Sequence, residues 1–218
     1  MIKENTSEIE YSAEWAEKDI EQARNYENER YSQPARGRKL DRIDKAFAQK
    51  LYSMVGSNAY IVDIPCGTGR FFEIFSKAAK LTMVDYSESM LKVAKERHEI
   101  PENVTMLQGD IASLPLSDNS ADLCFCMRFF HHLDNDKITL KVLKELSRIS
   151  RKYVAISFYN RNCLRYYRKK LRGKKIRAYY FSFSHIVELA KQAGLEVIEK
   201  QPKFNFIETQ CLVIFKKV

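Results

Sequence analysis

Three aspartates in the first half of the chain have side chains that could bind one polar ligand together. Asp63, Asp85 and Asp110 each lie at or near the end of an apolar run. Such runs are typical of the buried strands of a parallel sheet, and open α/β sheets bind ligands at the carboxyl ends of their strands. Each acid alone is equally consistent with a helix cap or an ordinary turn. Together they predict a ligand site at one edge of a sheet.

A glycine turn follows the first acid. Segment 60–72 reads Tyr-Ile-Val-Asp-Ile-Pro-Cys-Gly-Thr-Gly-Arg-Phe-Phe, so an apolar strand leads into Gly67 and Gly69. Glycine lets the backbone approach a ligand closely, and the amides of the helix expected next would face the same space. A dinucleotide fingerprint would have glycine where Phe72 stands, and the carboxylate of Asp63 would repel phosphates. The turn favours a zwitterionic or cationic ligand, with a nicotinamide-dependent oxidoreductase as a disfavoured alternative.

The other two acids suit a nucleoside. Asp85 lies 22 residues after Asp63, and an acid about 20 residues beyond such a turn typically accepts hydrogen bonds from ribose hydroxyls. Met90 follows in the next predicted helix and is expected to lie against an adenine ring. Asp110 is placed to accept a hydrogen bond from the adenine amine.

These segments resemble the motifs of the class I S-adenosylmethionine-dependent methyltransferases, in family order. Segment 63–70 resembles the D-x-P-C-G-T-G-R variant of motif I, in which Pro65 replaces the commoner glycine and stiffens the turn. Segment 121–133 resembles the fourth strand and following turn of the small-molecule branch. The resemblance implies S-adenosylmethionine as the cofactor. The cofactor contacts expected from the patterns and the resemblance are Asp63, Pro65, Cys66, Gly67, Thr68, Gly69, Arg70, Asp85, Tyr86, Met90, Asp110, Ile111, Met127 and Arg128.

Three side chains are candidates for a general base. A methyltransferase mainly aligns donor and acceptor, and it needs a base only when the acceptor holds its proton tightly. His131, His132 and Tyr159 are the candidates. Adjacent residues point in different directions, so we expect one of the two histidines to be structural. The run 128–132 differs from the Asn/Asp-Pro-Pro-Tyr/Phe of the amino-adenine nucleic-acid methyltransferases, which argues against that class.

The remaining patterns predict the elements that position these residues. Apolar runs predict strands over 60–64, 81–84, 104–111, 153–158, 195–199 and 209–215 and within 121–133, and helical spacing predicts helices over 87–98 and 184–193. With the resemblance they imply an α/β fold. Its core would be a Rossmann-like, seven-stranded, mostly parallel sheet with a C-terminal antiparallel hairpin and helices on both faces. Length and hydrophobic content predict a single domain over 1–218.

The segment 1–39 is predicted to be helical until Pro34 and Gly37 interrupt it, and the resemblance implies that it folds over the cofactor as a lid. Tyr26 and Tyr31 are candidates to lie against the sulfonium, because a cation favours an aromatic face. The ordinary alternative is that these tyrosines anchor the lid on the domain.

Positive charge is concentrated in one segment. Nine basic residues and no acid lie from Arg161 to Arg177, which equals the formal net charge of +9. This basic and aromatic insertion, 161–183, follows the fifth strand and therefore leaves the sheet at the edge predicted to hold the cofactor. The resemblance implies that such an insertion helps to cover the substrate side, where its cations would select an anionic acceptor or a neutral one carried on an anionic surface. Nucleic acid, an anionic membrane surface, or no partner at all are alternatives.

Composition argues against several other classes. Charges break every long apolar run well short of a membrane span, and the first residues have no signal-peptide character, so a cytoplasmic protein is expected. Five cysteines without a C-x-x-C pair indicate neither a zinc site nor a disulfide framework, and no metal is expected. Cys66 is the one thiol whose pKa a helix N-terminus could lower, but a packing role is expected for it rather than nucleophilic catalysis.

The sequence therefore predicts an S-adenosylmethionine-dependent methyltransferase with a small-molecule acceptor that is anionic, lipid-like or quinone-like. An RNA or protein methyltransferase using the basic segment 161–177 is the first alternative. The oxidoreductase and a non-catalytic S-adenosylmethionine-binding module follow.

Overall fold

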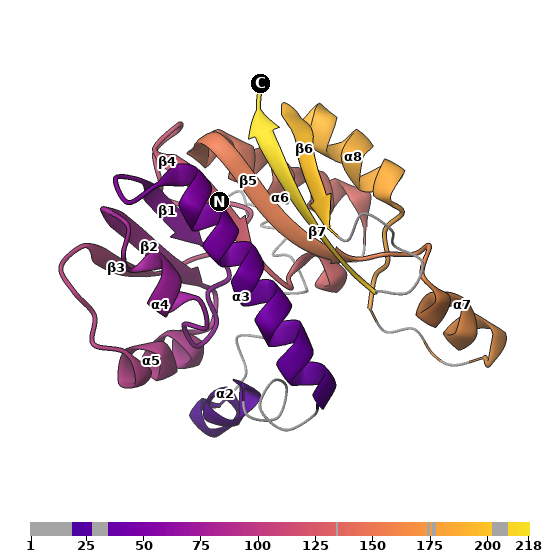
Figure 1. Cartoon of the computed structure of the whole chain (residues 1–218), viewed down its shortest axis with the longest axis horizontal. Helices are drawn as coiled ribbons and strands as arrows, with labels where there is room; N and C mark the ends of the chain where they lie inside the picture. The colour runs from indigo at the N-terminus through magenta and orange to yellow at the C-terminus, as the bar shows by residue number, and fades with distance from the viewer. Residues whose placement is uncertain (1–18, 28–34, 134, 174, 176–177, 202–208) are drawn as a thin grey trace, which may run out of the picture.

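The computed structural model describes residues 19–27, 35–133, 135–173, 175, 178–201 and 209–218. Its helices are α2 (Ile20–Glu27), α3 (Ala35–Val55), α4 (Phe72–Phe75), α5 (Glu88–Arg97), α6 (Asp136–Ile149), α7 (Leu164–Leu171) and α8 (Phe183–Gln192), with a 3-10 turn η3 (Phe130–His132). Its strands are β1 (Tyr60–Asp63), β2 (Lys80–Asp85), β3 (Val104–Gln108), β4 (Ala121–Cys126), β5 (Ser150–Tyr159), β6 (Leu195–Gln201) and β7 (Gln210–Lys217) (Figure 1).

All seven strands belong to one sheet, in the order β3-β2-β1-β4-β5-β7-β6. β1 pairs in parallel with β2 and β4, whereas β7 runs antiparallel to both β5 and β6. The predicted mostly parallel sheet with a closing antiparallel pair is confirmed. The strand order reverses between β1 and β4, and such a switch point opens a crevice at the carboxyl ends of the strands.

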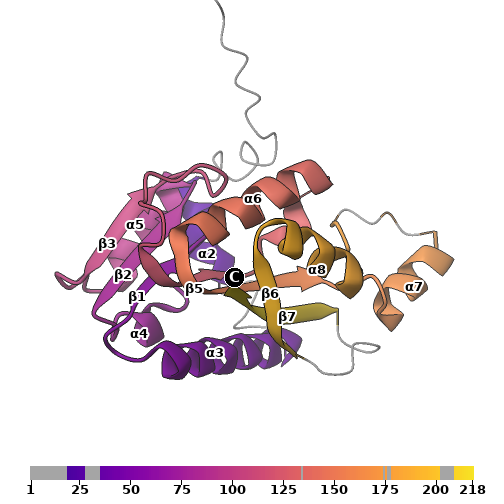
Figure 2. The same cartoon turned by 90° about the horizontal axis from the view of Figure 1, so that it is seen from above.

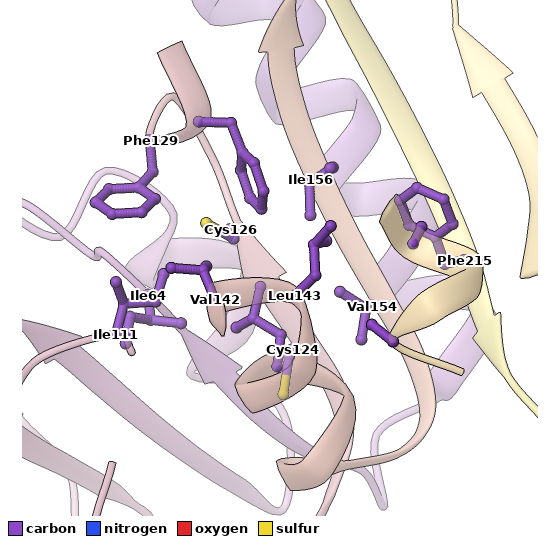
Figure 3. Close-up of a cluster of buried hydrophobic side chains, with 14 of the residues drawn as sticks. Ile64, Ile111, Cys124, Cys126, Phe129, Val142, Leu143, Val154, Ile156 and Phe215 are labelled. Atoms are coloured by element: carbon purple, nitrogen blue, oxygen red, sulfur yellow. The ribbon is translucent and has the colours of Figure 1, made fainter. Parts of the chain in front are cut away.

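The central strands are buried on both faces. All six residues of β4 are buried, as expected for a strand covered by helices on each side. Figure 2 shows α3 on one side of the sheet and α6 and α8 on the other. One core includes Phe47 of α3 and Phe75 of α4, and the other includes Leu143 of α6 and Ile186 of α8. Figure 3 shows part of the second core, with strand and helix side chains in contact.

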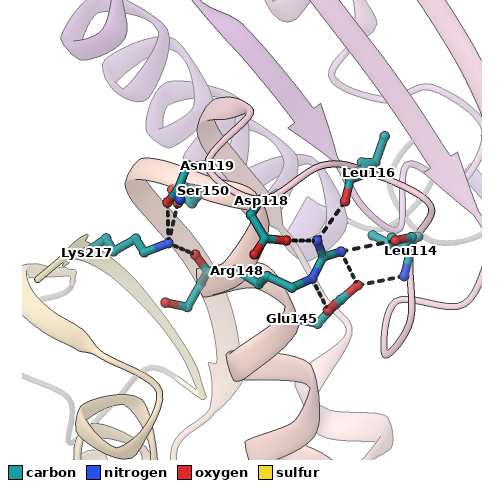
Figure 4. Close-up of polar contacts among 9 residues, drawn as sticks. Leu114, Leu116, Asp118, Asn119, Glu145, Arg148, Ser150 and Lys217 are labelled. Atoms are coloured by element: carbon teal, nitrogen blue, oxygen red, sulfur yellow. Dashed lines mark hydrogen bonds and ion pairs between the residues drawn. The ribbon is translucent and has the colours of Figure 1, made fainter.

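Arg148 fixes the loop that connects β3 to β4. Its guanidinium donates to the backbone oxygens of Leu114 (3.1 Å) and Leu116 (2.7 Å) and forms ion pairs with Glu145 and Asp118 (Figure 4). Residues earlier in the same loop border the candidate site described below, so this network holds one wall of that site from a distance.

The N-terminal part differs from the predicted lid in one respect. Gly37 does not interrupt a helix, because α3 begins at Ala35 and continues through Gly37 to Val55. Gly37 lies in the first turn, where backbone N–H groups lack intrahelical partners in any case. Residues 35–39 of the predicted lid thus belong to α3, and the lid's other described helix, α2, packs against α5 through Ala23, Met90 and Val93. Arg24 of α2 also forms a two-bond ion pair with Glu96 of α5, at 2.8 and 3.0 Å.

Candidate active site

The main pocket opens at the carboxyl ends of β1, β2 and β4, where the strand order reverses. It contains about 890 Å³ of non-atom space, part of it open to solvent, which is within the range of small-molecule sites. We refer to it as the donor pocket. Residues predicted as cofactor contacts that line it are Tyr26, Pro65, Cys66, Gly67, Thr68, Arg70, Asp85, Tyr86, Met90, Asp110, Ile111, Met127 and Arg128. It is also lined by Ile64, Phe71, Gly109, Phe129 and His132.

Asp85 connects the glycine turn to β2. Its Oδ2 accepts a hydrogen bond from the backbone N–H of Gly67 (2.8 Å), and its Oδ1 accepts from that of Ser87 (2.9 Å). A carboxylate offers about four acceptor positions, so both oxygens keep capacity for ligand hydroxyls. Asp85 is 7% exposed. Its geometry allows it both to hold the turn and to bind a diol.

Two walls of the donor pocket suit a flat ring. Met90 of α5 is buried and packs beside Tyr26 of α2, so the described lid helix does reach the pocket. Across from them, Gly109 N–H donates to the Asp85 backbone oxygen (3.0 Å), and Asp110 Oδ1 accepts from Ala112 N–H (2.9 Å). These bonds fix the turn after β3. Tyr31, the other tyrosine candidate, lies outside the described residues.

The glycine turn is held by β2 and by α5 more than by the short helix that follows it. Cys66 N–H donates to the Val84 oxygen (2.8 Å), and Thr68 Oγ1 accepts from Arg97 (3.0 Å). Helix α4 has only four residues, so its N-terminus supplies little dipole. Burial raises the pKa of the Cys66 thiol well above its usual value, and Asp85 and Asp63 raise it further, which agrees with the packing role expected for this cysteine.

Two predicted cofactor contacts, Asp63 and Gly69, are not among the residues lining the donor pocket. Asp63 is 1% exposed, and its Oδ1 has no hydrogen-bond partner among the described residues. Burial raises the pKa of Asp63, although Arg70 lowers it and Asp85 raises it further. Gly69 lies against the ring of His98.

A buried network missed by the sequence analysis lies beside the donor pocket. Asp44 of α3, fully buried, accepts from Arg70 (2.9 Å) and from the side-chain amide of Gln210 (2.8 Å), and lies 3.8 Å from Arg128. Arg128 also donates to Gln210 Oε1 (2.9 Å). Asp41, at the edge, pairs with Arg70 at 3.2 Å. These acids and Gln210 hold two arginines in place at the pocket, and single polar residues on α3 and β7 gave no motif that would reveal them.

The candidate bases occupy different places. His132 lines the donor pocket, whereas His131 is buried and stacks on Tyr159, with ring centroids 4.2 Å apart. Tyr179 N–H donates to the backbone oxygen of His131 (2.9 Å). The Tyr159 hydroxyl accepts a long hydrogen bond from Arg128 (3.4 Å) and faces a second pocket. Among the three, the geometry brings only His132 to the donor pocket.

The second pocket lies beside the donor pocket, and Arg128 borders both. It is formed by residues of α3, β5, α7 and β7 and by the segment before α8. We refer to it as the side pocket. Two of the nine predicted basic residues, Arg165 and Lys169 of α7, line it. Lys174 and Arg177 of the same basic segment lie outside the described residues.

Within the described part of the chain, no cluster of three or more His, Cys, Asp or Glu side chains is arranged to hold a metal ion. None of the described helices is long and apolar enough to cross a membrane.

Comparison with known proteins connects this geometry to a family. Residues 61–152 match the family described as a methyltransferase domain. Demethylmenaquinone methyltransferase of Staphylococcus aureus is 38% identical over 92 residues, which are 40% of this chain and 37% of that protein. The chain thus matches little more than a third of the length of these curated relatives.

Solved structures share the fold over most of the chain. Magnesium protoporphyrin IX methyltransferase from Synechocystis, solved with bound S-adenosylhomocysteine, superposes with a TM-score of 0.72 at 15% identity, covering 84% of this chain and 85% of that one. An S-adenosylmethionine-dependent methyltransferase of Methanosarcina mazei gives 0.66 at 17% identity, covering 78% and 97%. The resemblance to class I S-adenosylmethionine-dependent methyltransferases is confirmed by the family match and by the fold.

Proposed function

We propose that this chain, whose residues 61–152 match a methyltransferase domain, is an enzyme that transfers a methyl group from S-adenosylmethionine to a small molecule. The observation that carries the proposal is the donor pocket. It brings the glycine turn, the Asp85 carboxylate and the Met90 wall together at the switch point of the sheet. Its residues fit the cofactor chemically. The pocket offers the Asp85 carboxylate to the ribose, apolar side chains to the adenine, and two arginines to the carboxylate of the cofactor's amino-acid end.

The chain's own residues would bind and orient the two reactants. S-adenosylmethionine supplies an activated methyl group on sulfur. Asp85 accepts hydrogen bonds from the ribose, Met90 and Ile111 contact the adenine, and Arg70 faces the amino-acid end. The adjacent apolar walls of Phe71 and Phe129 exclude water. His132 accepts the acceptor's proton when that proton must leave, because it alone of the candidate bases borders the donor pocket.

A quinone-like or similarly flat acceptor is supported by two observations. The relative that is 38% identical over 92 residues is named for demethylmenaquinone. Apolar side chains, including Met127 and Phe129, line the donor pocket close to His132. RNA or protein is the alternative acceptor class, suggested by the cations of α7. An RNA methyltransferase would bind RNA with an affinity that falls steeply as salt rises.

Calorimetric titration with S-adenosylhomocysteine, and separately with reduced nicotinamide adenine dinucleotide, tests the proposal. We expect the first to bind and the second not to. Asp85→Asn keeps the shape but removes the charge, and losing charge-assisted hydrogen bonds worth about 1.5–3 kcal/mol should weaken S-adenosylhomocysteine roughly 10- to 150-fold. Glu199→Gln, a control on the edge strand β6 whose ion-pair partner is Lys50, should bind like the wild type. Binding of the nicotinamide nucleotide instead would reject the proposal.

A further inference from the structure

The side pocket carries positive charge that its surroundings do not neutralise. Arg165 and Lys169 are four residues apart on α7, so they share one face of the helix. Among the described residues, no acidic side chain lines the pocket, and neither Arg165 nor Lys169 forms an ion pair. The third cation at the pocket, Arg128, differs because Asp44 lies 3.8 Å from it. Two uncompensated cations therefore face one pocket.

Tyrosine rings form the wall next to these cations. Tyr159 and Tyr180 both line the side pocket, with ring centroids 5.5 Å apart. Tyr159 is braced on its other side by His131, and Tyr180 packs on Tyr166 of α7 at 5.1 Å. Aromatic faces held in this way suit the body of a flat molecule. The pocket thus combines a cationic end with an aromatic wall.

Helix α7 has two pairs of basic residues, and only one pair lines the side pocket. Arg168 and Lys170 belong to the same helix but do not line the side pocket. Both are exposed. Figures 1 and 2 show α7 at the end of the molecule away from α5. The helix therefore offers two pairs of cations that are equal in charge and different in position.

We propose that the side pocket binds the negatively charged group of the methyl acceptor, a carboxylate or a phosphate on a flat molecule, through Arg165 and Lys169. The acceptor's body lies along Tyr159 and Tyr180, and its reacting end passes Arg128 into the donor pocket, since Arg128 borders both spaces. This inference rests on the proposed function, because only a methyltransferase would use the bound molecule as its methyl acceptor. The anion site itself is a property of the side pocket and can be tested without turnover.

The test uses 2-naphthoate as an anionic flat probe and 2-naphthamide as its neutral counterpart, titrated into the full chain by calorimetry. We expect the wild type to bind the carboxylate more tightly than the amide. Arg165→Ser/Lys169→Ser should weaken the carboxylate roughly tenfold, because each of these solvent-accessible cations contributes about threefold to its affinity, and should leave the amide nearly unchanged. Arg168→Ser/Lys170→Ser lowers the net charge equally and should retain the wild-type preference.

The inference is overturned if the wild type shows no preference for the carboxylate, or if both double variants weaken it alike, since that would indicate only diffuse attraction. S-adenosylhomocysteine titrated into the same three proteins separates the two proposals. We expect equal affinities in all three. Failure of the wild type to bind S-adenosylhomocysteine would reject the proposed function. The preference for 2-naphthoate over 2-naphthamide would still show whether the side pocket binds anions.

Discussion

The two glycines of the turn should respond differently to the same substitution. Gly67 (φ +57°) and Gly69 (φ +83°) both have positive φ, where an added Cβ costs about 1–2 kcal/mol. Gly67 lines the donor pocket, and a Cβ there meets no described atom within 4 Å. Gly69 does not line the pocket. Gly67→Ala should therefore affect ligand binding, and Gly69→Ala should affect folding.

The size of the difference follows from the neighbours of Gly69. A Cβ at this position would lie 2.9 Å from Cδ2 of His98 and 3.3 Å from Cε of Met83. The His98 ring cannot move freely because it stacks on Phe72, with centroids 4.3 Å apart. Overpacking of this kind adds about 1–3 kcal/mol. We expect Gly69→Ala to lose about 2–5 kcal/mol of unfolding free energy, against about 1–2 kcal/mol for Gly67→Ala.

Urea unfolding and calorimetry with S-adenosylhomocysteine measure the two effects on the same variants. Gly67→Ala should bind the ligand at least about tenfold more weakly, because its methyl group occupies ligand space, a loss of about 1.4 kcal/mol. Folded Gly69→Ala should bind with nearly wild-type affinity. Equal losses of stability in the two variants, or a larger loss of affinity in Gly69→Ala, would refute this division of roles.

Three further predictions concern buried titratable groups. Burial raises the pKa of Asp63 although Arg70 lowers it. The wild type should therefore lose stability relative to Asp63→Asn as pH rises above about 4, by at most about 1.4 kcal/mol per pH unit. Urea unfolding measures this, and a difference in unfolding free energy between the two proteins that stays constant from about pH 4 to 8 would contradict it. At Asp122, burial would raise the pKa, but hydrogen bonds from Arg151, Tyr60 N–H and Lys152 lower it overall, so Asp122→Asn should lose about 1–3 kcal/mol at pH 7. That loss should shrink as pH falls below about 4, through the range in which the carboxyl protonates, and acid unfolding curves would show it. Burial raises the pKa of Cys124 to about 12, so mass spectrometry should find its alkylation by iodoacetamide at pH 8 at least about a hundredfold slower in the folded than in the unfolded protein.

The strands and their acids were predictable because they depend on local pattern. β2 covers Lys80–Asp85 where 81–84 was predicted, and α8 covers Phe183–Gln192 where 184–193 was predicted. Continuous apolar runs identify strands buried on both faces, and the parallel arrangement then brings Asp85 and Asp110 to one edge. The donor pocket is thus built mainly from residues that sequence patterns select.

What the sequence could not predict depends on tertiary contacts. Whether His131 or His132 borders the donor pocket is decided by the turn η3 and by stacking on Tyr159. Asp44 precedes Arg70 by 26 residues in the sequence, and the two side chains meet only because α3 packs on the sheet. The division of the α7 cations also requires the position of the helix, since sequence alone gives Arg165 and Arg168 the same charge and neighbourhood.

A crystal structure of the protein with S-adenosylhomocysteine tests the central claim most directly. We predict that both ribose hydroxyls lie within hydrogen-bond distance of the Asp85 carboxylate, at roughly 2.5–3.0 Å, with the adenine against Met90. A ligand bound elsewhere, or one in the donor pocket with its ribose turned away from Asp85, would contradict the account.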